Sequence, residues 1–344
     1  MARARRPPIP LTVIGGPLGA GKTTLINRAL KQPAFADTAV ILNEFGEVNL
    51  ENALVERAGD GIVALAGGCV CCAVRGELVD ALENLLRGLD NGRIAALGRV
   101  IVEANAEADA SAILAGIGMH PYLPMRFRPD GIVTVVAADD VDALDPASAR
   151  QLAMADVIAV SRAGSRLDEI AGRLAQLNPI GRIVDAGAVA PTVLTGHGPF
   201  DPVVTDVDKW LGPPDAVGGA HALRVFTVAR ERPIPLSALD RFLDYLAALQ
   251  GPNLIRVRGI VAVDGGESAV VEAIGAFFLP PRLISSPPGA VATRFSVTAG
   301  GLDRQGFEAY LDAFFNEARI DTPDRTAMTD NPLRVTGFSA RPGR

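Results

Sequence analysis

The chain has 344 residues, of which 49% are hydrophobic and 21% are charged, with a net charge of −6. This length and composition are typical of a globular protein of about two domains, without the run of roughly 18–20 apolar residues that a membrane span needs. The acidic balance excludes a general basic surface, so we expect no nucleic-acid partner. The basic residues 1–6 are followed by prolines and a strand-like run, not by the apolar helix of a secretory signal, so we expect a cytoplasmic protein.

Short apolar runs and amphipathic stretches alternate through the first half of the chain. The runs lack polar alternation, which is typical of strands buried on both faces. Helical spacing follows residue 21 and recurs over 76–89, 152–155 and 170–177. This order predicts an α/β fold with a doubly wound, mostly parallel sheet. The predicted strands cover residues 11–16, 38–45, 62–67, 99–105, 131–139, 156–161 and 181–188.

A second domain is predicted after a change in composition. Residues 187–220 are rich in Gly, Pro and Asp, which break helices and strands, and we interpret them as a linker region at the end of a first domain over residues 1–200. A smaller α+β domain is expected over 221–325, followed by a loose tail at 326–344. Its predicted strands are 222–230, 255–263 and 292–300, and its predicted helices are 236–249 and 303–318.

A phosphate-binding motif follows the first predicted strand. In GGPLGAGKTTLINRAL, residues 15–30, the pattern G-x-x-x-x-G-K-T stands between a strand and a helix. Backbone N–H groups of such a loop face phosphates, Lys22 reaches the outer phosphates, and the Thr23 hydroxyl can ligate Mg²⁺. A glycine-rich turn that only opens a helix is the weaker alternative. The candidate nucleotide-binding residues are Gly16, Pro17, Leu18, Gly19, Ala20, Gly21, Lys22, Thr23 and Thr24.

All three cysteines of the chain, Cys69, Cys71 and Cys72, lie within four positions of one another. They directly precede a predicted helix, whose dipole favours the thiolate form that soft metals bind. Zinc takes four ligands, so three thiolates leave one position for another protein group, water or a transferred ligand. We interpret the cluster as a site for Zn²⁺ or Co²⁺, and chance clustering of small buried residues is the alternative.

Three motifs in this order and spacing resemble the CobW-type P-loop GTPases: GGPLGAGKTTLINRAL, VILNEFGEVNLE and GGCVCCAVRGEL. The wider group includes the urease and hydrogenase nickel-insertion GTPases. Residues 120–140 are similar to the continuing GTPase domain, and 251–263 through 298–311 resemble the CobW C-terminal domain. The resemblance implies a P-loop NTPase fold, GTP as the nucleotide, and a metal chaperone that holds zinc or cobalt at its Cys-x-Cys-Cys motif.

The resemblance also implies roles for three glutamates. Residues 43–47, NEFGE, would form a nucleotide-sensing switch, in which Glu44 or Glu47 supplies the fourth metal ligand or assists Mg²⁺. A solvated turn fits the bare residues equally well. Glu103 ends the predicted strand RVIVE. This is the usual place of a carboxylate that acts on Mg²⁺ through water or orients the attacking water. A charged residue at the end of a strand is otherwise ordinary. Lys22 and Glu103 are the candidate catalytic residues.

The chain departs from the family at the motif that reads guanine. Where the family has Asn-Lys-x-Asp, residues 161–164 read Ser-Arg-Ala-Gly. Ser161 and Arg162 are therefore candidate base contacts, but the preference for GTP rests on the resemblance alone, and ATP remains open.

Two further departures concern hydrolysis and metal. Ala106 and Ala110 replace the glycine and the proline that follow the family's glutamate, which would weaken hydrolysis or the switch that reports it. Ala64 stands where the family often has a glutamate before the cysteines, so one carboxylate near the metal is missing.

These observations support two functional hypotheses. The first is a slow GTP hydrolase that loads or delivers Zn²⁺ or Co²⁺ to a client metalloprotein or a metal-inserting enzyme. The second is a nucleotide- and metal-responsive sensor or scaffold that does not hydrolyse. No membrane or nucleic-acid partner is expected, and a homodimer remains open.

Overall fold

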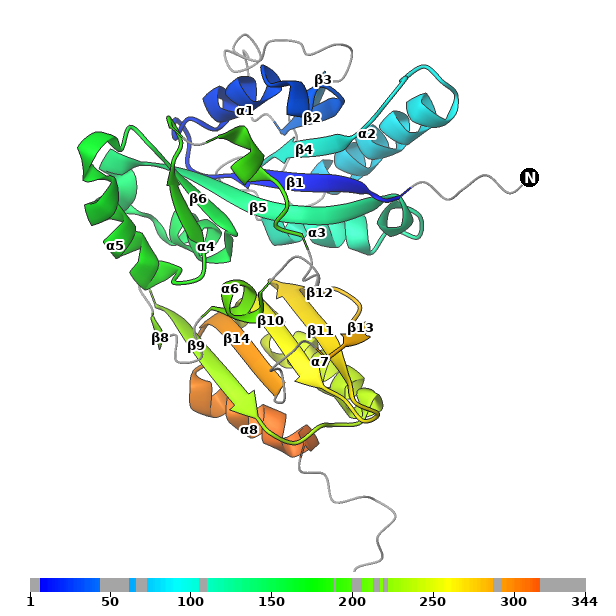
Figure 1. Ribbon diagram of the computed structural model, residues 1–344, viewed down its shortest axis with the longest axis vertical. Coiled ribbons are helices and arrows are strands. Elements are labelled where there is room, and N and C mark those ends of the chain that lie inside the picture. The colour runs from blue at the N-terminus through cyan, green and yellow to red at the C-terminus, as the bar shows by residue number, and fades with distance from the viewer. Residues whose placement is uncertain are drawn as a thin grey trace, which may run out of the picture.

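The computed structural model describes residues 7–43, 62–65, 73–104, 110–188, 190–198, 206–212, 217–218, 222–286 and 293–315. Figure 1 shows two sheets with their helices, one above the other in that view. The first sheet is built from residues 9–185 and the second from residues 217–300. None of the helices in the described ranges is both long and apolar enough to cross a membrane.

The first sheet has seven strands in the order β3-β2-β4-β1-β5-β6-β7, and every neighbouring pair is parallel. All carboxyl ends therefore lie at one edge, where α/β folds bind ligands. The prediction of a parallel, doubly wound P-loop fold is confirmed. The strands are β1 (Ile9–Gly15), β2 (Thr38–Asn43), β3 (Ile62–Leu65), β4 (Arg99–Glu103), β5 (Phe127–Ala137), β6 (Val157–Ser161) and β7 (Arg182–Asp185).

Helices cover both faces of this sheet. One buried cluster joins α1 (Lys22–Leu30) to one face, with Phe35 of η1 (Pro33–Phe35) and Leu194 of η5 (Pro191–Leu194). A larger cluster joins four helices to the opposite face: α2 (Ala73–Asp90), α3 (Ala110–Gly118), α4 (Pro146–Met154) and α5 (Leu167–Leu177). Short 3₁₀ helices η2 (Leu123–Met125), η3 (Ala138–Ala143) and η4 (Gly164–Arg166) lie between these elements. Because both faces are covered, the strands read as continuous apolar runs.

The second sheet is antiparallel and carries helices α7 (Leu236–Gln250) and α8 (Arg304–Phe315) on one face. Four phenylalanines, Phe226, Phe242, Phe295 and Phe307, pack edge to face between the sheet and these helices. Its order is β12-β11-β10-β14-β9-β8, with β13 also paired to β11. The strands are β8 (Val217–Gly218), β9 (Leu223–Arg230), β10 (Leu254–Ala262), β11 (Glu267–Ile274), β12 (Phe277–Phe278), β13 (Arg282–Ser285) and β14 (Thr293–Gly300), and η6 (Gly251–Asn253) precedes β10.

The predicted linker region contains regular structure. Helix α6 (Val207–Leu211) lies within 187–220, begins at Asp206, whose side chain accepts the N–H groups of Asp208 and Lys209, and packs Trp210 and Leu211 against the second sheet. Gly and Pro surround α6 without interrupting it, so a segment rich in these residues still contains a short helix. The predicted tail 326–344 lies outside the described residues.

A buried ionic cluster joins the two sheets. Asp156, at the start of β6, accepts hydrogen bonds from the Ile132 N–H at 2.7 Å, from Arg256 Nη2 at 3.2 Å and from Arg258 Nη2. Arg256 also donates to Glu272 of β11 and to the carbonyl of Met154. Two guanidinium groups thus meet two carboxylates, and all four side chains are buried, so each charge depends on the others for compensation.

Candidate functional site

The phosphate-loop motif forms the turn between β1 and α1, at the carboxyl edge of the first sheet. Gly16 has φ +134°, and a Cβ there would stand 2.0 Å from the carbonyl oxygen of Val135. Gly21, with φ +101°, is the N-cap of α1, and Gly19 has φ +73°. Only glycine adopts these conformations readily, so the spacing of the glycines determines the path of the loop.

Lys22 closes the loop with its own side chain. Its Nζ donates to the carbonyl oxygens of Gly16 at 2.9 Å and Pro17 at 3.0 Å, and the residue is only 5% exposed. The ammonium group therefore already lies inside the loop, beside the positive end of α1, where phosphate oxygens bind. Leu18, at the tip, is 78% exposed.

Thr23 and Glu103 meet beside the loop. The Thr23 hydroxyl donates to the two carboxylate oxygens of Glu103 at 3.2 and 3.4 Å, and both residues are buried. Sheet register brings Glu103 here, because it pairs with Ile14 of β1 and Leu42 of β2. Mg²⁺ prefers oxygen ligands and keeps several bound waters, which can donate hydrogen bonds to a carboxylate. The hydroxyl of Thr23 and the carboxylate of Glu103, beside a phosphate loop, therefore fit Mg²⁺.

The 161–166 segment contacts the phosphate loop from the end of β6. Ser161 Oγ donates to the Ala20 carbonyl at 2.6 Å, and Arg162 Nη1 donates to the Gly19 carbonyl at 3.3 Å. Arg162 has a left-handed φ of +55°, which is uncommon for a residue with a long side chain. Arg166 donates to Asp139, and this hydrogen bond, with the nearby charge of Arg162, lowers the pKa of the Asp139 carboxyl.

A cavity of about 270 Å³ opens between this segment, α1 and the end of β7. The described part of its lining includes the guanidinium groups of Arg28 and Arg162 and no carboxylate. Arg28 donates to the Gly187 carbonyl, which joins α1 to the 185–188 turn. The cavity lies directly beside the phosphate loop, because Gly21 and Thr24 belong to its described lining. The described lining residues are Gly21, Thr24, Leu25, Arg28, Ser161, Arg162, Ala186 and Gly187.

The structure thus brings together, at one sheet edge, the phosphate loop, Glu103, Ser161 and Arg162. The predicted metal ligands Cys69, Cys71, Cys72, Glu44 and Glu47 lie outside the described residues, as does Ala106. Helix α2 begins at Ala73, the residue after Cys72. Within the described ranges, no group of three or more His, Cys, Asp or Glu side chains could hold a metal ion.

Sequence reasoning missed two parts of this architecture. Arg28 and the 186–187 turn carry no motif. The ionic cluster did leave a signal, because Arg256 and Arg258 interrupt an apolar strand at positions i and i+2 and so point to the same face, where charges need a buried partner.

Comparisons with known proteins agree with this architecture. Residues 10–184 match the family model described as CobW/HypB/UreG, nucleotide-binding domain, and residues 223–315 match the cobalamin synthesis protein cobW C-terminal domain. The solved structure of the Zn(II)-bound YjiA GTPase from E. coli superposes with a TM-score of 0.65 and 22% identity, over 90% of this chain and 99% of that one, which shows the same fold.

Curated relatives include proteins of bacteria and yeast. The zinc chaperone YjiA of Escherichia coli strain K12 is 29% identical over 269 residues, which cover 75% of this chain and 83% of that protein. The zinc-regulated GTPase metalloprotein activator 1 of Schizosaccharomyces pombe is 33% identical over 141 residues, 39% of this chain and 33% of that protein. A zinc chaperone CobW of a Sinorhizobium species is 31% identical over 159 residues, 42% of this chain and 43% of that protein. With both of its domains matched in order, the chain belongs to the CobW/HypB/UreG family of nucleotide-binding proteins.

Proposed function

We propose that this protein is a GTP-dependent metallochaperone that binds Zn²⁺ or Co²⁺ through Cys69, Cys71 and Cys72 and delivers it to a client metalloprotein. The contact between Thr23 and Glu103 carries the nucleotide part of the proposal, because it places a hydroxyl and a carboxylate beside a formed phosphate loop. The zinc chaperones among the relatives and the Cys-x-Cys-Cys sequence support the metal part.

The described residues have distinct roles in the proposed reaction. Lys22 exchanges its carbonyl partners for phosphate oxygens and compensates the negative charge of the triphosphate. Thr23 would hold Mg²⁺, which supplies Lewis-acid stabilisation of the phosphates when bound. Glu103, released from Thr23, would orient the water that attacks the terminal phosphate. Backbone N–H groups at the start of α1 bind the remaining phosphate oxygens.

Metal transfer would follow from the incomplete set of thiolates. Three cysteines leave one coordination position for a ligand that changes, and we propose that Glu44 or Glu47 supplies it in one nucleotide state. Nucleotide binding would close the 43–47 segment on the metal, and hydrolysis would open it. Since Asn43 ends β2 beside Glu103's strand, this segment begins next to the nucleotide edge.

A phosphate-release assay with GTP, with and without Zn²⁺ or Co²⁺, tests the enzymatic part. We expect slow hydrolysis that depends on Mg²⁺ and responds to the soft metal. Nucleotide binding without any release would instead favour the non-hydrolysing sensor, which the alanine at position 106 also favours.

A cobalt titration tests the metal part separately. One Co²⁺ per chain should give thiolate-to-metal charge-transfer absorption, because thiolates select soft metals. The triple variant Cys69→Ala, Cys71→Ala, Cys72→Ala should lose it. Unchanged absorption and stoichiometry in that variant would place the metal elsewhere.

A further inference from the structure

A second cavity lies between the two domains, at the edge of the first sheet opposite the phosphate loop. It has a volume of about 330 Å³, within the range of small-molecule sites, which often occur at domain interfaces. Leu11, near the start of β1, lines this cavity, whereas the end of β1 leads into the phosphate loop. Four strand residues, roughly 13 Å of strand, separate them, so both sites can be filled together.

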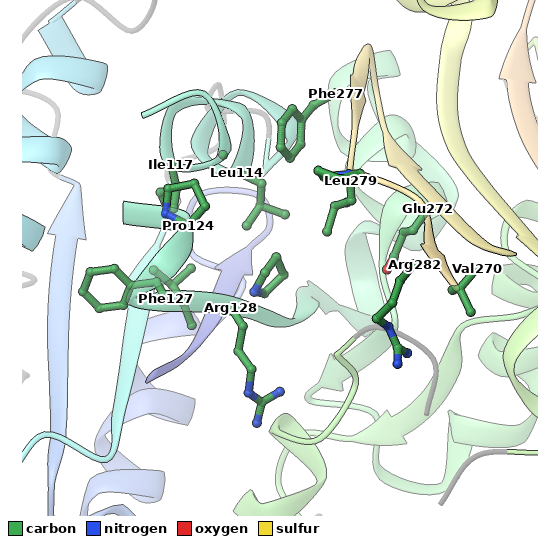
Figure 2. Close-up of a pocket in the computed structure, with 14 residues that line it drawn as sticks. Leu114, Ile117, Pro124, Phe127, Arg128, Val270, Glu272, Phe277, Leu279 and Arg282 are labelled. Carbon is green, nitrogen blue, oxygen red and sulfur yellow. The ribbon is translucent and has the colours of Figure 1, made fainter. Parts of the chain in front are cut away.

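Both domains contribute side chains to its walls. Figure 2 shows Leu114 of the first domain facing Phe277 and Leu279 of the second across the opening, and Ile117 and Phe127 also belong to the lining on the side of the first domain. The end of α3 approaches β12 so closely that a Cβ at Gly118 would stand 1.9 Å from the Phe277 ring. An apolar ligand here would contact the first sheet and the second sheet simultaneously.

Two arginines and one carboxylate are the charged residues in the described lining of the cavity. Arg128 and Arg282 both extend toward the same side of the opening in Figure 2, and the Arg128 side chain is 48% exposed although Nη1 lies 3.2 Å from Asp130 Oδ1. The one carboxylate in the described lining, Glu272, is already paired with Arg256 and Arg258. A guanidinium group carries five N–H donors and binds carboxylates in a fixed geometry.

The sheet edge beside the cavity disfavours an added strand. Between β12 and β13 the edge contains Pro280 and Pro281, which have no N–H to offer a partner strand. A ligand of this cavity would therefore be recognised by its apolar contacts with the walls and by its contacts with Arg128 and Arg282.

We infer that this cavity binds a small amphipathic carboxylate, whose ring or branched hydrocarbon body lies against Leu114, Phe277 and Leu279 and whose carboxylate meets Arg128 and Arg282. Because the ligand contacts both domains, its binding stabilises their relative position. The inference is independent of the nucleotide reaction and of the cysteine site.

The test uses the full chain and two probes. The fluorescent anion 8-anilinonaphthalene-1-sulfonate reports occupancy, and 4-phenylbutyrate competes with it, with the neutral 4-phenylbutanamide as the charge control. We expect saturable binding, and competition by the carboxylate at least about tenfold stronger than by the amide, because charge-assisted hydrogen bonds are lost in the amide. Equal competition by the two compounds, or no saturable binding, would overturn the inference. The cavity would then be a gap in the packing or a binding site for a protein partner.

Variants locate the site. Leu279→Trp, at a half-buried position of the cavity wall, should fill the cavity, and Arg282→Gln should remove a positive charge from it. Each substitution should lower the affinity for 4-phenylbutyrate at least about tenfold. The matched controls are Leu249→Trp, at a leucine 51% exposed on α7, and Arg304→Gln on α8. If Leu279→Trp does not melt cooperatively, Arg282→Gln still tests the site, because Arg282 is exposed and its substitution leaves the core intact. Unchanged affinity in Arg282→Gln, or equal losses in the controls, would contradict the assignment.

Discussion

Thr23 and Glu103, 80 positions apart in the sequence, meet through a 3.2 Å hydrogen bond from the threonine hydroxyl to a carboxylate oxygen. The contact connects the first turn of α1 to the end of β4, the two places from which P-loop proteins take their magnesium and water-orienting groups. Parallel register makes the meeting unavoidable, because β4 lies next to β1.

Glu103→Gln should therefore separate binding from hydrolysis. The amide keeps the size of the side chain but cannot accept a proton or orient water as a carboxylate does. Phosphate release should fall by at least about 10²-fold, while binding of a non-hydrolysable GTP analogue persists. The control is Glu267→Gln, at an exposed position of β11. Equal rates in wild type and Glu103→Gln would remove Glu103 from the reaction.

If the 270 Å³ cavity beside the phosphate loop holds the base, the protein should discriminate poorly between GTP and ATP. The described lining of the cavity includes two arginines and no carboxylate, and Gly164 occupies the place of the aspartate that would bond to the N1–H and N2–H₂ groups of guanine. We expect a GTP preference below about 10²-fold in competition against one fluorescent nucleotide. A larger preference in wild type would show that another residue reads the base.

Gly164→Asp should restore a guanine preference. Gly164 has φ +54°, a Cβ added there would meet no atom within 4 Å, and aspartate tolerates the left-handed region better than most residues. The GTP-over-ATP ratio should rise at least about tenfold, since charged hydrogen bonds contribute about 1.5–3 kcal/mol each. Gly164→Asn, which fits the same conformation without the charge, is the control and should raise it less.

Asp156→Asn should destabilise the junction between the domains. Burial raises the pKa of Asp156, but Arg256, Arg258 and the Ile132 N–H more than offset this, so the pKa is lowered. Breaking a buried ionic cluster costs about 3–5 kcal/mol, measurable by urea unfolding at neutral pH. Asp139→Asn, which loses an exposed pair with Arg166, should change stability little.

The pH dependence of this difference follows from the lowered pKa. The stabilisation from ionised Asp156 is complete above the unfolded-state value of about 3.9 and is lost as pH falls through the lower folded-state value. The gap between wild type and Asp156→Asn should thus be constant between about pH 5 and 7 and shrink below about pH 4. A gap that widens on acidification would contradict the assignment.

Much of the first domain was predictable from the sequence. The apolar runs located all seven parallel strands, and the glycine spacing located the phosphate loop, because both depend on local composition. Helix α3 was missed, since its sequence ASAILAGIG is apolar almost throughout and shows no clear helical face. Strand β5 begins at Phe127, four residues before the predicted start. The prediction began too late because Arg128 and Asp130 interrupt the apolar run on which it relied.

The second domain was predicted less completely. Strand β11 was missed although Asp264-Gly265 stands between two apolar runs, which is a strong hairpin signal. With β11, Glu272 was missed, although the hairpin register places it opposite Arg258. The meeting of Arg256 and Arg258 with Asp156 depends on the association of two domains, which no local pattern encodes. The 270 Å³ cavity beside the phosphate loop likewise combines residues from three distant segments.

In the proposed chaperone, nucleotide binding and metal binding should be coupled. The most direct test of this coupling is the Zn²⁺ affinity, measured by competition with a chromophoric chelator, with and without Mg²⁺ and a non-hydrolysable GTP analogue. We predict tighter Zn²⁺ binding with the nucleotide, an equal reciprocal gain in nucleotide affinity with Zn²⁺, and loss of both gains in Lys22→Ala. The same Zn²⁺ affinity in the presence and absence of nucleotide would contradict the chaperone mechanism.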